Sequence, residues 1–599
     1  MLDYLIFFFS DIPSGLTINS FQQRQFVPQR AIMFTLARSS AIDRIYDVTS
    51  HKNGIPLLPS NFLPESYTFE DLYRELVKKN EAGKDEELVS LLILASCLKE
   101  KSNIVEGPDD EKWYEKFEDY LSNTTLPDGK VFSLDKHDEE QSDQVHKAKQ
   151  RRDKYSLCIL SISYLLEISS KSLQQPKNST LLSLIPFTST ENPWTTPQSQ
   201  QIATKILEKH SFYVQSSKFL VTYLLISFIR PIFSEAAAPK SITASSRKAA
   251  PSSAPPRHLD IRESSPSRQP WRSNIPHTIT VLQWIIGSIS PEILRTDEVF
   301  PQLVPALLIL LDSPSNPIRI HALRLLPSLF SKMGKKLLIK TGLGEVFEDA
   351  IHPVLLFLPS ITPVEDTLKL LPVGYEALYA ICDAKWPERD DEQTSTGAIT
   401  APTSSLLSQK TNTAESTIRL RLAFLDKIIR HAILPAYTHC QEIPSVVEIL
   451  ISQIGIIIPK MKISGVKHLK NILPIISNIL INPFFPDTSP SLIIKTLRTL
   501  REVILVLWPR ISVKEHRLLI LRALGLLYCN TRSNSVGRSV DRKIVDVEAE
   551  TEITKELQET GKVFVAAVQM GDDEAKEAFG LELDTLVQTE GGLASIFPV

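Results

Sequence analysis

The stretch Phe300–Lys332, FPQLVPALLILLDSPSNPIRIHALRLLPSLFSK, indicates the fold of this chain. Before the turn at residues 312–317, apolar residues recur at spacings of three and four, which is typical of one helix face: Leu303, Val304, Leu307, Leu308 and Leu311. A second stripe with that spacing follows the turn: Ile318, Ala322, Leu325, Leu326 and Leu329. An isolated helix pair cannot bury its stripe, but stacked pairs can, so the stretch predicts one unit of an α-solenoid.

The same pattern of helices and short breaks continues from about Ile293 to Asn530. The helix candidates are residues 275–289, 298–311, 317–333, 344–358, 364–384, 416–436, 443–458, 463–481, 488–508 and 512–530. Pro305, Pro327 and Pro474 fall inside these segments, where proline removes a hydrogen bond and clashes with the preceding turn, so we expect kinks or breaks there. The predicted fold class is all-α: a HEAT-like α-solenoid of stacked antiparallel helix pairs, with an N-terminal helical region and a disordered linker.

Changes in composition divide the chain into segments. Residues 1–60 are an N-terminal extension, and residues 61–235 are an N-terminal helical region. Ala, Ser, Pro and Arg dominate residues 236–272, which hold too little apolar surface to offset the entropy of ordering and are therefore expected to form a disordered linker. The HEAT-like α-solenoid then occupies residues 273–543, with a flexible insert at 387–416, and residues 544–599 form an acidic helical C-terminal segment.

The composition fits helices and excludes several other classes. Gly is scarce at 20 residues and Pro plentiful at 40, and sustained strict alternation is missing, so an all-β fold is not expected. Five scattered cysteines without a CxxC indicate reduced core thiols in a cytoplasmic or nuclear protein. The apolar N-terminus lacks the basic start of a signal peptide. The longest candidate membrane span, Phe219–Ile229, is only 11 residues, so no membrane helix is expected.

Charge is polarised toward the C-terminal end. Residues 416–543 contain 19 Lys/Arg and 7 Asp/Glu, whereas residues 544–599 contain 3 Lys/Arg and 13 Asp/Glu. One explanation is that the acidic tail covers the end of the solenoid and neutralises its basic face. The other is that the basic face meets an acidic partner. Phosphate of a nucleic acid is one such partner, but few aromatic residues accompany the cations, so nucleic-acid binding is the lesser alternative.

The motifs that usually carry chemistry are absent from the sequence. It contains no GxxxxGK[ST] phosphate loop, no HExxH and no GxSxG. We therefore expect a protein that is not an enzyme, with no catalytic, cofactor-binding or metal-binding residues. A solenoid instead offers binding surfaces, and the candidate partner-binding residues are a basic ridge and a corner: Lys467, His468, Lys470, Trp508, Pro509 and Arg510. Their alternative role is packing between repeats, as for Arg319, which begins a helix just after the turn that holds Asp312.

Several short motifs, in order along residues 290–530, resemble the family of Tel-two-interacting protein two. They are Phe300–Asp312, Ile318–Leu323, Thr341–Leu343, Phe347–Pro353, Leu425–Arg430, Ile433–Pro435, Val466–Lys470, Ile472–Pro474 and Trp508–Ile511. Asn192-Pro193-Trp194 in the first half resembles a fungal version of the same family. The motifs are modest one by one, and their order and spacing together make the resemblance specific. It covers less than half of the chain.

This resemblance implies a non-catalytic scaffold in the Triple T complex. Members of this family join Tel-two and Tel-two-interacting protein one in that complex, which works with the heat-shock-ninety chaperone and its R-two-TP co-chaperone. Together they stabilise phosphatidylinositol-kinase-related kinases, in the cytoplasm and nucleus. The alternative is a generic HEAT-repeat adaptor in transport or another assembly.

Overall fold

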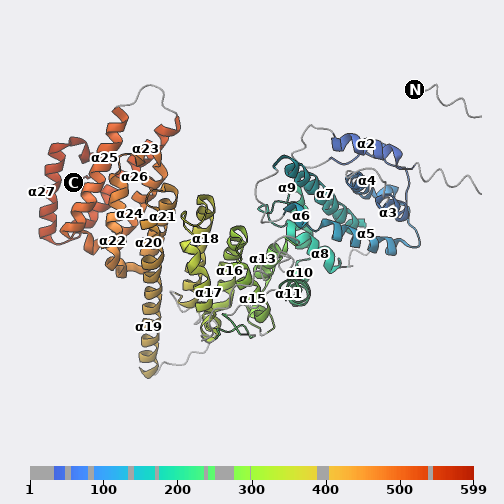
Figure 1. Ribbon diagram of the computed structural model, residues 1–599, viewed down its shortest axis with the longest axis horizontal. Coiled ribbons are helices and arrows are strands. Elements are labelled where there is room, and N and C mark those ends of the chain that lie inside the picture. Colours follow the sequence, from blue (N-terminus) through green and yellow to red (C-terminus); the bar gives the residue numbers. More distant parts are fainter. Residues whose placement is uncertain are drawn as a thin grey trace, which may run out of the picture. The chain divides into compact units, whose positions relative to one another are not determined.

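The protein is described by a computed structural model in which two compact units are distinguished (Figure 1). Unit 1 is Met1–Ile232 with Ser265–Ser288, and unit 2 is Phe233–Ser264 with Ile289–Val599. The described residues are 33–46, 56–77, 86–132, 141–168, 175–234, 241–243, 245–249, 275–296, 298–387, 404–536 and 544–598. Over these residues the chain is helical, and strand-like pairing is limited to two isolated bridges, Tyr67–Ile104 and Ile242–Lys248.

Unit 1 is built around α4 (Glu86–Lys99), in which every residue from Leu88 to Leu98 is buried. A helix that is apolar on all sides is stable only when other helices cover it. Here α2 (Thr35–Tyr46), α3 (Phe69–Val77) and α7 (Gln141–Ile168) pack against it. Further helices up to Ser288 are α5 (Asp110–Thr125), α6 (Gly129–Phe132), α8 (Asn178–Leu184), α9 (Pro197–Lys209), α10 (Ser211–Val214), η4 (Lys218–Ile229), α11 (Arg230–Ser234) and α13 (Thr278–Ser288).

Unit 2 is a stack of helices in two layers. In one layer each helix packs against the next: α16 (Asn316–Thr341), α18 (Val364–Lys385), α21 (Pro444–Met461), α24 (Pro490–Ile511) and α26 (Ile544–Gln569). The other layer contains α15 (Phe300–Leu311), α17 (Leu343–Ile351), α19 (Ser404–Ile428), α20 (Leu434–Cys440), α22 (Leu469–Ile481) and α25 (Lys514–Val536). All ten stripe residues of the stretch Phe300–Lys332 are buried. The predicted all-α stack of helix pairs is therefore confirmed.

The breaks expected at prolines are not where the sequence placed them. Helices α15, α16 and α22 continue through Pro305, Pro327 and Pro474. The break in α16 lies at Gly334, whose φ of 75° is readily adopted only by glycine. Arg295 Nε donates to the carbonyls of Lys332 and Met333 at 3.2 and 3.1 Å, so the carbonyls at this break are satisfied. The buried stripes on both sides of each proline outweigh the lost backbone bond.

Two predicted flexible segments are partly ordered. Within the proposed linker at residues 236–272, residues 241–249 are described except 244, and they fold onto unit 2. The Lys248 amide donates to the Thr341 carbonyl at 2.9 Å, and the Lys248 ammonium pairs with Glu345. Within the proposed insert at residues 387–416, residues 404–416 belong to α19. The composition of these segments does not reveal either feature. The first segment is ordered by residues that lie far away in the sequence, and the second is the beginning of a helix that continues past it.

The acidic C-terminal segment covers the last helices of the array. Helix α26 packs along α24, and Glu556 on α26 accepts hydrogen bonds from Arg498 Nε and Arg501 Nη1, both at 2.8 Å. Helix α27 (Asp573–Thr589) follows, and its Glu582 accepts two hydrogen bonds from Arg517, from Nε at 2.8 Å and from Nη2 at 2.7 Å. The acidic segment is thus paired with basic residues of α24 and α25.

No helix in the described part of the chain combines the length and apolarity needed to cross a membrane.

Glu556 supplies a test of this end cover. Burial raises its pKa, but the hydrogen bonds and charges of Arg498 and Arg501 outweigh burial and leave the pKa below its ordinary value of 4.5. A depressed carboxyl pKa stabilises the fold above that ordinary value, and the contribution is lost as the pH falls through the folded-state pKa. We expect Glu556→Gln to lower the free energy of unfolding by about 2 kcal/mol at pH 7. The difference from wild type should shrink below about pH 4.5.

Urea unfolding of the full chain at pH 7 and pH 3.5 measures this effect. Glu577→Gln is the matched control, because Glu577 is exposed on α27 and has no ion-pair partner among the described residues. Equal unfolding free energies for wild type and Glu556→Gln at pH 7 would contradict the prediction.

Candidate partner-binding surface

The predicted basic ridge lies on η10 (Lys462–His468) and the first turn of α22. Its centre is a carboxylate from another helix, Asp426 on α19. Lys467 Nζ and His468 Nε2 each lie 2.8 Å from Asp426 Oδ1, and Arg430 Nε lies 3.0 Å from Oδ2. Three cations or potential cations thus converge on one carboxylate, and this cluster ties η10 to α19.

The members of the ridge differ in what they offer to a partner. The side chain of His468 is only 2% exposed, and burial lowers its pKa despite the opposing effect of Asp426. His468 is therefore a packing residue, and it cannot be part of an exposed basic ridge. Lys467 is exposed at 43% but is held by Asp426. Lys470 is exposed and has no ion-pair partner among the described residues, so it is the ridge cation open to a partner.

The predicted corner follows a break in α24. Leu507 leaves helical geometry at φ −111° and ψ 19°, two residues before Pro509, and the helix then continues to Ile511. The helix predicted over residues 488–508 therefore extends past Pro509, and its break precedes that proline. Trp508 is 37% exposed, and Pro509 and Arg510 are exposed too, so the three form a projecting corner. The Arg510 carbonyl lies 2.8 Å from His516 Nδ1, and the Arg510 guanidinium has no ion-pair partner among the described residues.

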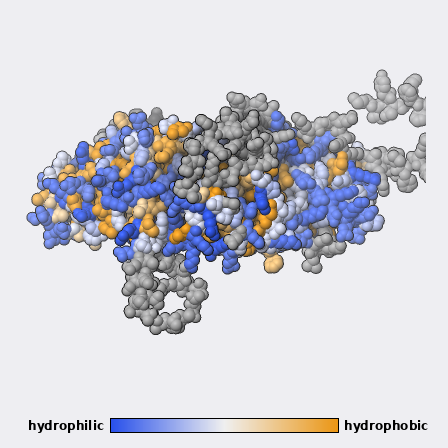
Figure 2. All heavy atoms as spheres, turned by 60° about the horizontal axis from the view of Figure 1, so that its bottom comes forward, coloured by the Kyte–Doolittle hydropathy of each residue, from blue (hydrophilic) through white to orange (hydrophobic). Residues whose placement is uncertain are grey.

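The ridge and the corner come from adjoining elements. Segment η10 packs on α24, where Gly465 lies close to Leu507. Within the described residues, no hydrogen bond, ion pair or ring contact joins the ridge residues to the corner residues. Exposed apolar side chains accompany both, since Ile463 on η10 is 54% and Leu505 on α24 is 53% exposed. Figure 2 shows such apolar patches between polar side chains over unit 2, at the left of the view.

Pairing of the basic residues bears on the nucleic-acid alternative. Most of the cations on which that alternative depends are bound to carboxylates: Lys427 to Glu348, Lys460 to Asp383, Lys495 to Glu448, Arg498 and Arg501 to Glu556, Arg517 to Glu582, and Arg532 to Glu590. A nucleic-acid track needs several unpaired cations in sequence along the surface. The pairing favours a protein partner instead.

Other residues singled out in the sequence hold the fold together. Arg319 donates to the carbonyls of Leu311 and Ser313 at 3.2 and 2.6 Å and stacks over the Phe357 ring at 4.5 Å. It therefore secures its own turn and the neighbouring segment. Trp194 is 2% exposed and donates to the Pro186 carbonyl at 2.9 Å. Within the described residues no group of three or more His, Cys, Asp or Glu side chains is arranged to hold a metal ion.

Comparison with protein families identifies a match over the middle of the chain. The model of the Tti2 family, which is the family of Tel-two-interacting protein two, matches residues 180–487. This range is slightly more than half of the chain and includes Lys467, His468 and Lys470, whereas the corner lies beyond it. No curated protein matches the sequence significantly.

Among solved structures, the chain is similar to the karyopherin-type protein Kap121p. The structure of Kap121p alone matches with 11% identity and a TM-score of 0.25, over 87% of this chain and 57% of that chain. Kap121p bound to Ste12p matches with 12% identity and a TM-score of 0.27, again over 87% and 57%. This chain thus spans little more than half the length of Kap121p, and similarity at this level identifies no shared function.

Asp426 should matter for stability, and Lys470 should not. Replacing Asp426 with Ala leaves His468 buried and Lys467 without its carboxylate, so we expect a loss of about 1–3 kcal/mol in the free energy of unfolding. Lys470→Ala should change it by less than about 0.5 kcal/mol, because an exposed side chain without a partner contributes little. Urea unfolding followed by circular dichroism measures both variants. An Asp426→Ala chain as stable as wild type would show that the cluster does not hold η10 in place.

Proposed function

This chain belongs to the Tti2 family, whose membership implies a subunit of the Triple T complex, and from that premise we propose that it acts as a non-catalytic scaffold which binds Tel-two-interacting protein one and Tel-two. In this role it assists the heat-shock-ninety chaperone and its R-two-TP co-chaperone in the maturation of phosphatidylinositol-kinase-related kinases, in the cytoplasm and nucleus. The observation that carries the proposal is the family match over residues 180–487.

The structure supplies a surface suited to such a scaffold. Lys470 and Arg510 are exposed cations with no ion-pair partner among the described residues, and Trp508 projects beside Arg510. Aromatic and Arg side chains are the residue types that most often dominate binding energy at protein interfaces. We therefore assign the corner Trp508–Arg510 and Lys470 as the partner-binding surface. Lys467 supports it through Asp426, and His468 lies beneath it.

Affinity capture of the tagged full chain, followed by mass spectrometry, tests the proposal as a whole. Recovery of Tel-two and Tel-two-interacting protein one is the expected result. A set of transport or trafficking proteins without these two would favour the generic adaptor, and salt-sensitive recovery of nucleic acid would favour the nucleic-acid alternative. Either of those outcomes would reject the scaffold role.

The surface itself is tested by reversing the two unpaired cations. We expect the double variant Lys470→Glu, Arg510→Glu to reduce capture of Tel-two-interacting protein one by about tenfold, because two charges at the interface would then repel the partner's acidic groups. Capture measured against purified partner at fixed salt provides the readout. The helical circular-dichroism signal and the unfolding midpoint should not change, since neither cation is paired within the described residues.

Lys205→Glu is the matched control for this variant. Lys205 is an exposed cation on α9 of unit 1, without an ion-pair partner among the described residues. The Lys205→Glu variant should leave capture of Tel-two-interacting protein one unchanged. If the double variant captures the partner as well as Lys205→Glu does, the interface lies elsewhere on the chain, although the scaffold role itself would stand.

A further inference from the structure

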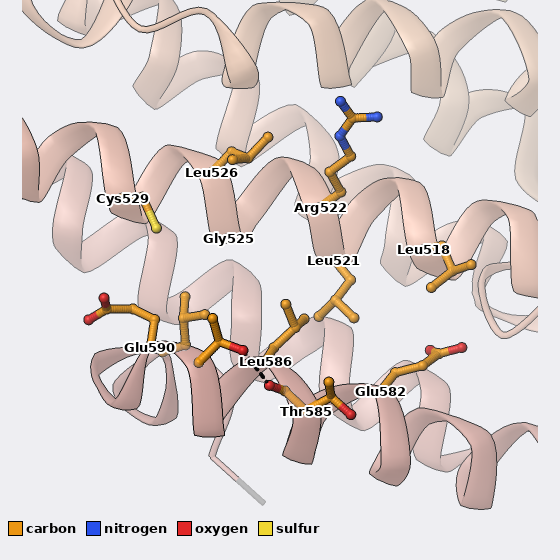
Figure 3. A pocket seen from close by; sticks show the side chains of 12 residues that line it. Leu518, Leu521, Arg522, Gly525, Leu526, Cys529, Glu582, Thr585, Leu586 and Glu590 are labelled. Atoms are coloured by element: carbon orange, nitrogen blue, oxygen red, sulfur yellow. Dashed lines mark hydrogen bonds between the residues drawn. The ribbon is translucent and has the colours of Figure 1, made fainter.

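We propose that the groove between α25 and α27 is a docking site for a short amphipathic helix of a partner protein, with leucine-type side chains on one face and carboxylates beside them. The groove has a volume of about 690 Å³ and is lined mostly by apolar side chains (Figure 3). It is separate from the ridge and corner residues proposed above. The proposal that this groove binds a partner helix is therefore independent of the proposed scaffold role.

The lining of the groove is apolar and incompletely covered. Leu521 on α25 and Leu586 on α27 point toward one another across it (Figure 3). Leu518 is 39% exposed at one end, and Leu526 and Leu586 are half-buried, so apolar surface remains accessible to water. Gly525 lies between them, and a Cβ added there would meet nothing within 4 Å. The groove is therefore open at its middle because this position has no side chain.

The dimensions suit a helical peptide. The lining residues of α25 extend from Leu518 to Cys529, which at about 1.5 Å per residue corresponds to roughly 16 Å along the helix axis, or three turns. An amphipathic helix of that length places anchors at positions i, i+3 or i+4, and i+7 on one face, which is the usual way in which a helix occupies an apolar groove. The open elongated shape argues against a small molecule, which is normally enclosed on most of its surface.

Charge around the groove selects an acidic helix. The two carboxylates that line it are already bound, Glu582 to Arg517 at 2.7 Å and Glu590 to Arg532 at 2.7 Å. Lys514 and Arg522 are exposed on α25, one turn to either side of Leu518, and neither has an ion-pair partner among the described residues. Arg522 is among the lining residues, and its side chain extends from α25 on the side away from α27 (Figure 3). A helix seated in the groove would therefore lie beside α25, the helix that carries the unpaired cations Lys514 and Arg522.

The test uses the full chain and two labelled peptides of about three helical turns. Both carry the same leucine face; one has Glu and the other Lys at the flanking positions. Fluorescence anisotropy should show that the Glu peptide binds at least about tenfold more tightly than the Lys peptide. Gly525→Leu should weaken binding of the Glu peptide by about tenfold or more, because the new side chain fills the groove. The double variant Lys514→Glu, Arg522→Glu should reverse the preference between the two peptides.

Two controls make the result specific. Gly580→Leu introduces the same residue at an exposed glycine of α27 where a Cβ also meets nothing within 4 Å, and it should bind the Glu peptide like wild type. Leu favours a helix more than Gly does, so both variants should fold. The variant Lys470→Glu, Arg510→Glu should bind the peptide normally, which separates this groove from the surface assigned under the scaffold role.

Three results would overturn the proposal. The first is equal affinity of the two peptides for wild type, and the second is a Gly525→Leu chain that binds as tightly as Gly580→Leu. The third is self-association of the chain in sedimentation that Gly525→Leu abolishes, which would assign the groove to a second copy of this protein.

Discussion

Unit 2 depends on one interaction, the burial of each helix's apolar stripe against the next helix in the same layer. In α24, for example, Leu497, Leu500 and Ile504 are fully buried between α21 and α26. Each helix in such a stack contributes one buried face and needs a neighbour on either side, so a stack has two ends that are not covered by another repeat. The C-terminal end of this stack is covered by α26, an amphipathic helix whose charged residues meet the basic residues of α24. The apolar and electrostatic contacts of this end therefore coincide on the same pair of helices.

That coincidence explains why charge counted along the sequence gives a poor description of the surface. Many of the Lys and Arg side chains in residues 416–543 are paired with carboxylates from the tail and from preceding helices, although most of these pairs lie at the surface. Exposed pairs of this kind each contribute little, but Arg517 is only 3% exposed and binds Glu582 through two nitrogens, which fixes the position of α27. What remains for partners is a small set of unpaired cations, including Lys470 and Arg510. These lie beside exposed apolar residues, which is the composition of a protein-binding surface more than of a nucleic-acid track.

The sequence predicts the parts of this architecture that depend on local periodicity. The apolar stripes between Leu303 and Leu329 are recognisable in the sequence because every stripe residue is apolar and faces the core. His468 could not be placed in this way, because its direction depends on the 3-10 turn of η10 and on Asp426, 42 positions earlier in the chain. The break at Gly334 was also missed, since its freed carbonyls are satisfied by Arg295, a turn residue distant in the sequence. Likewise, residues 241–249 look like linker until the backbone of Thr341 is available to pair with Lys248.

The end cover itself is incomplete, and its position suggests why. A cover needed only to keep the stack from associating would present polar residues outward and bury the apolar stripe of α25 entirely. Instead α27 lies beside α25 with a groove between them (Figure 3), Leu518 stays 39% exposed, and Gly525 leaves space that one ordinary side chain would fill. Closing this space would be simple, because leucine at this position favours the helix and removes apolar surface from water. An opening that is so readily closed, and that is bordered by unpaired cations, is better explained by a bound segment than by imperfect packing.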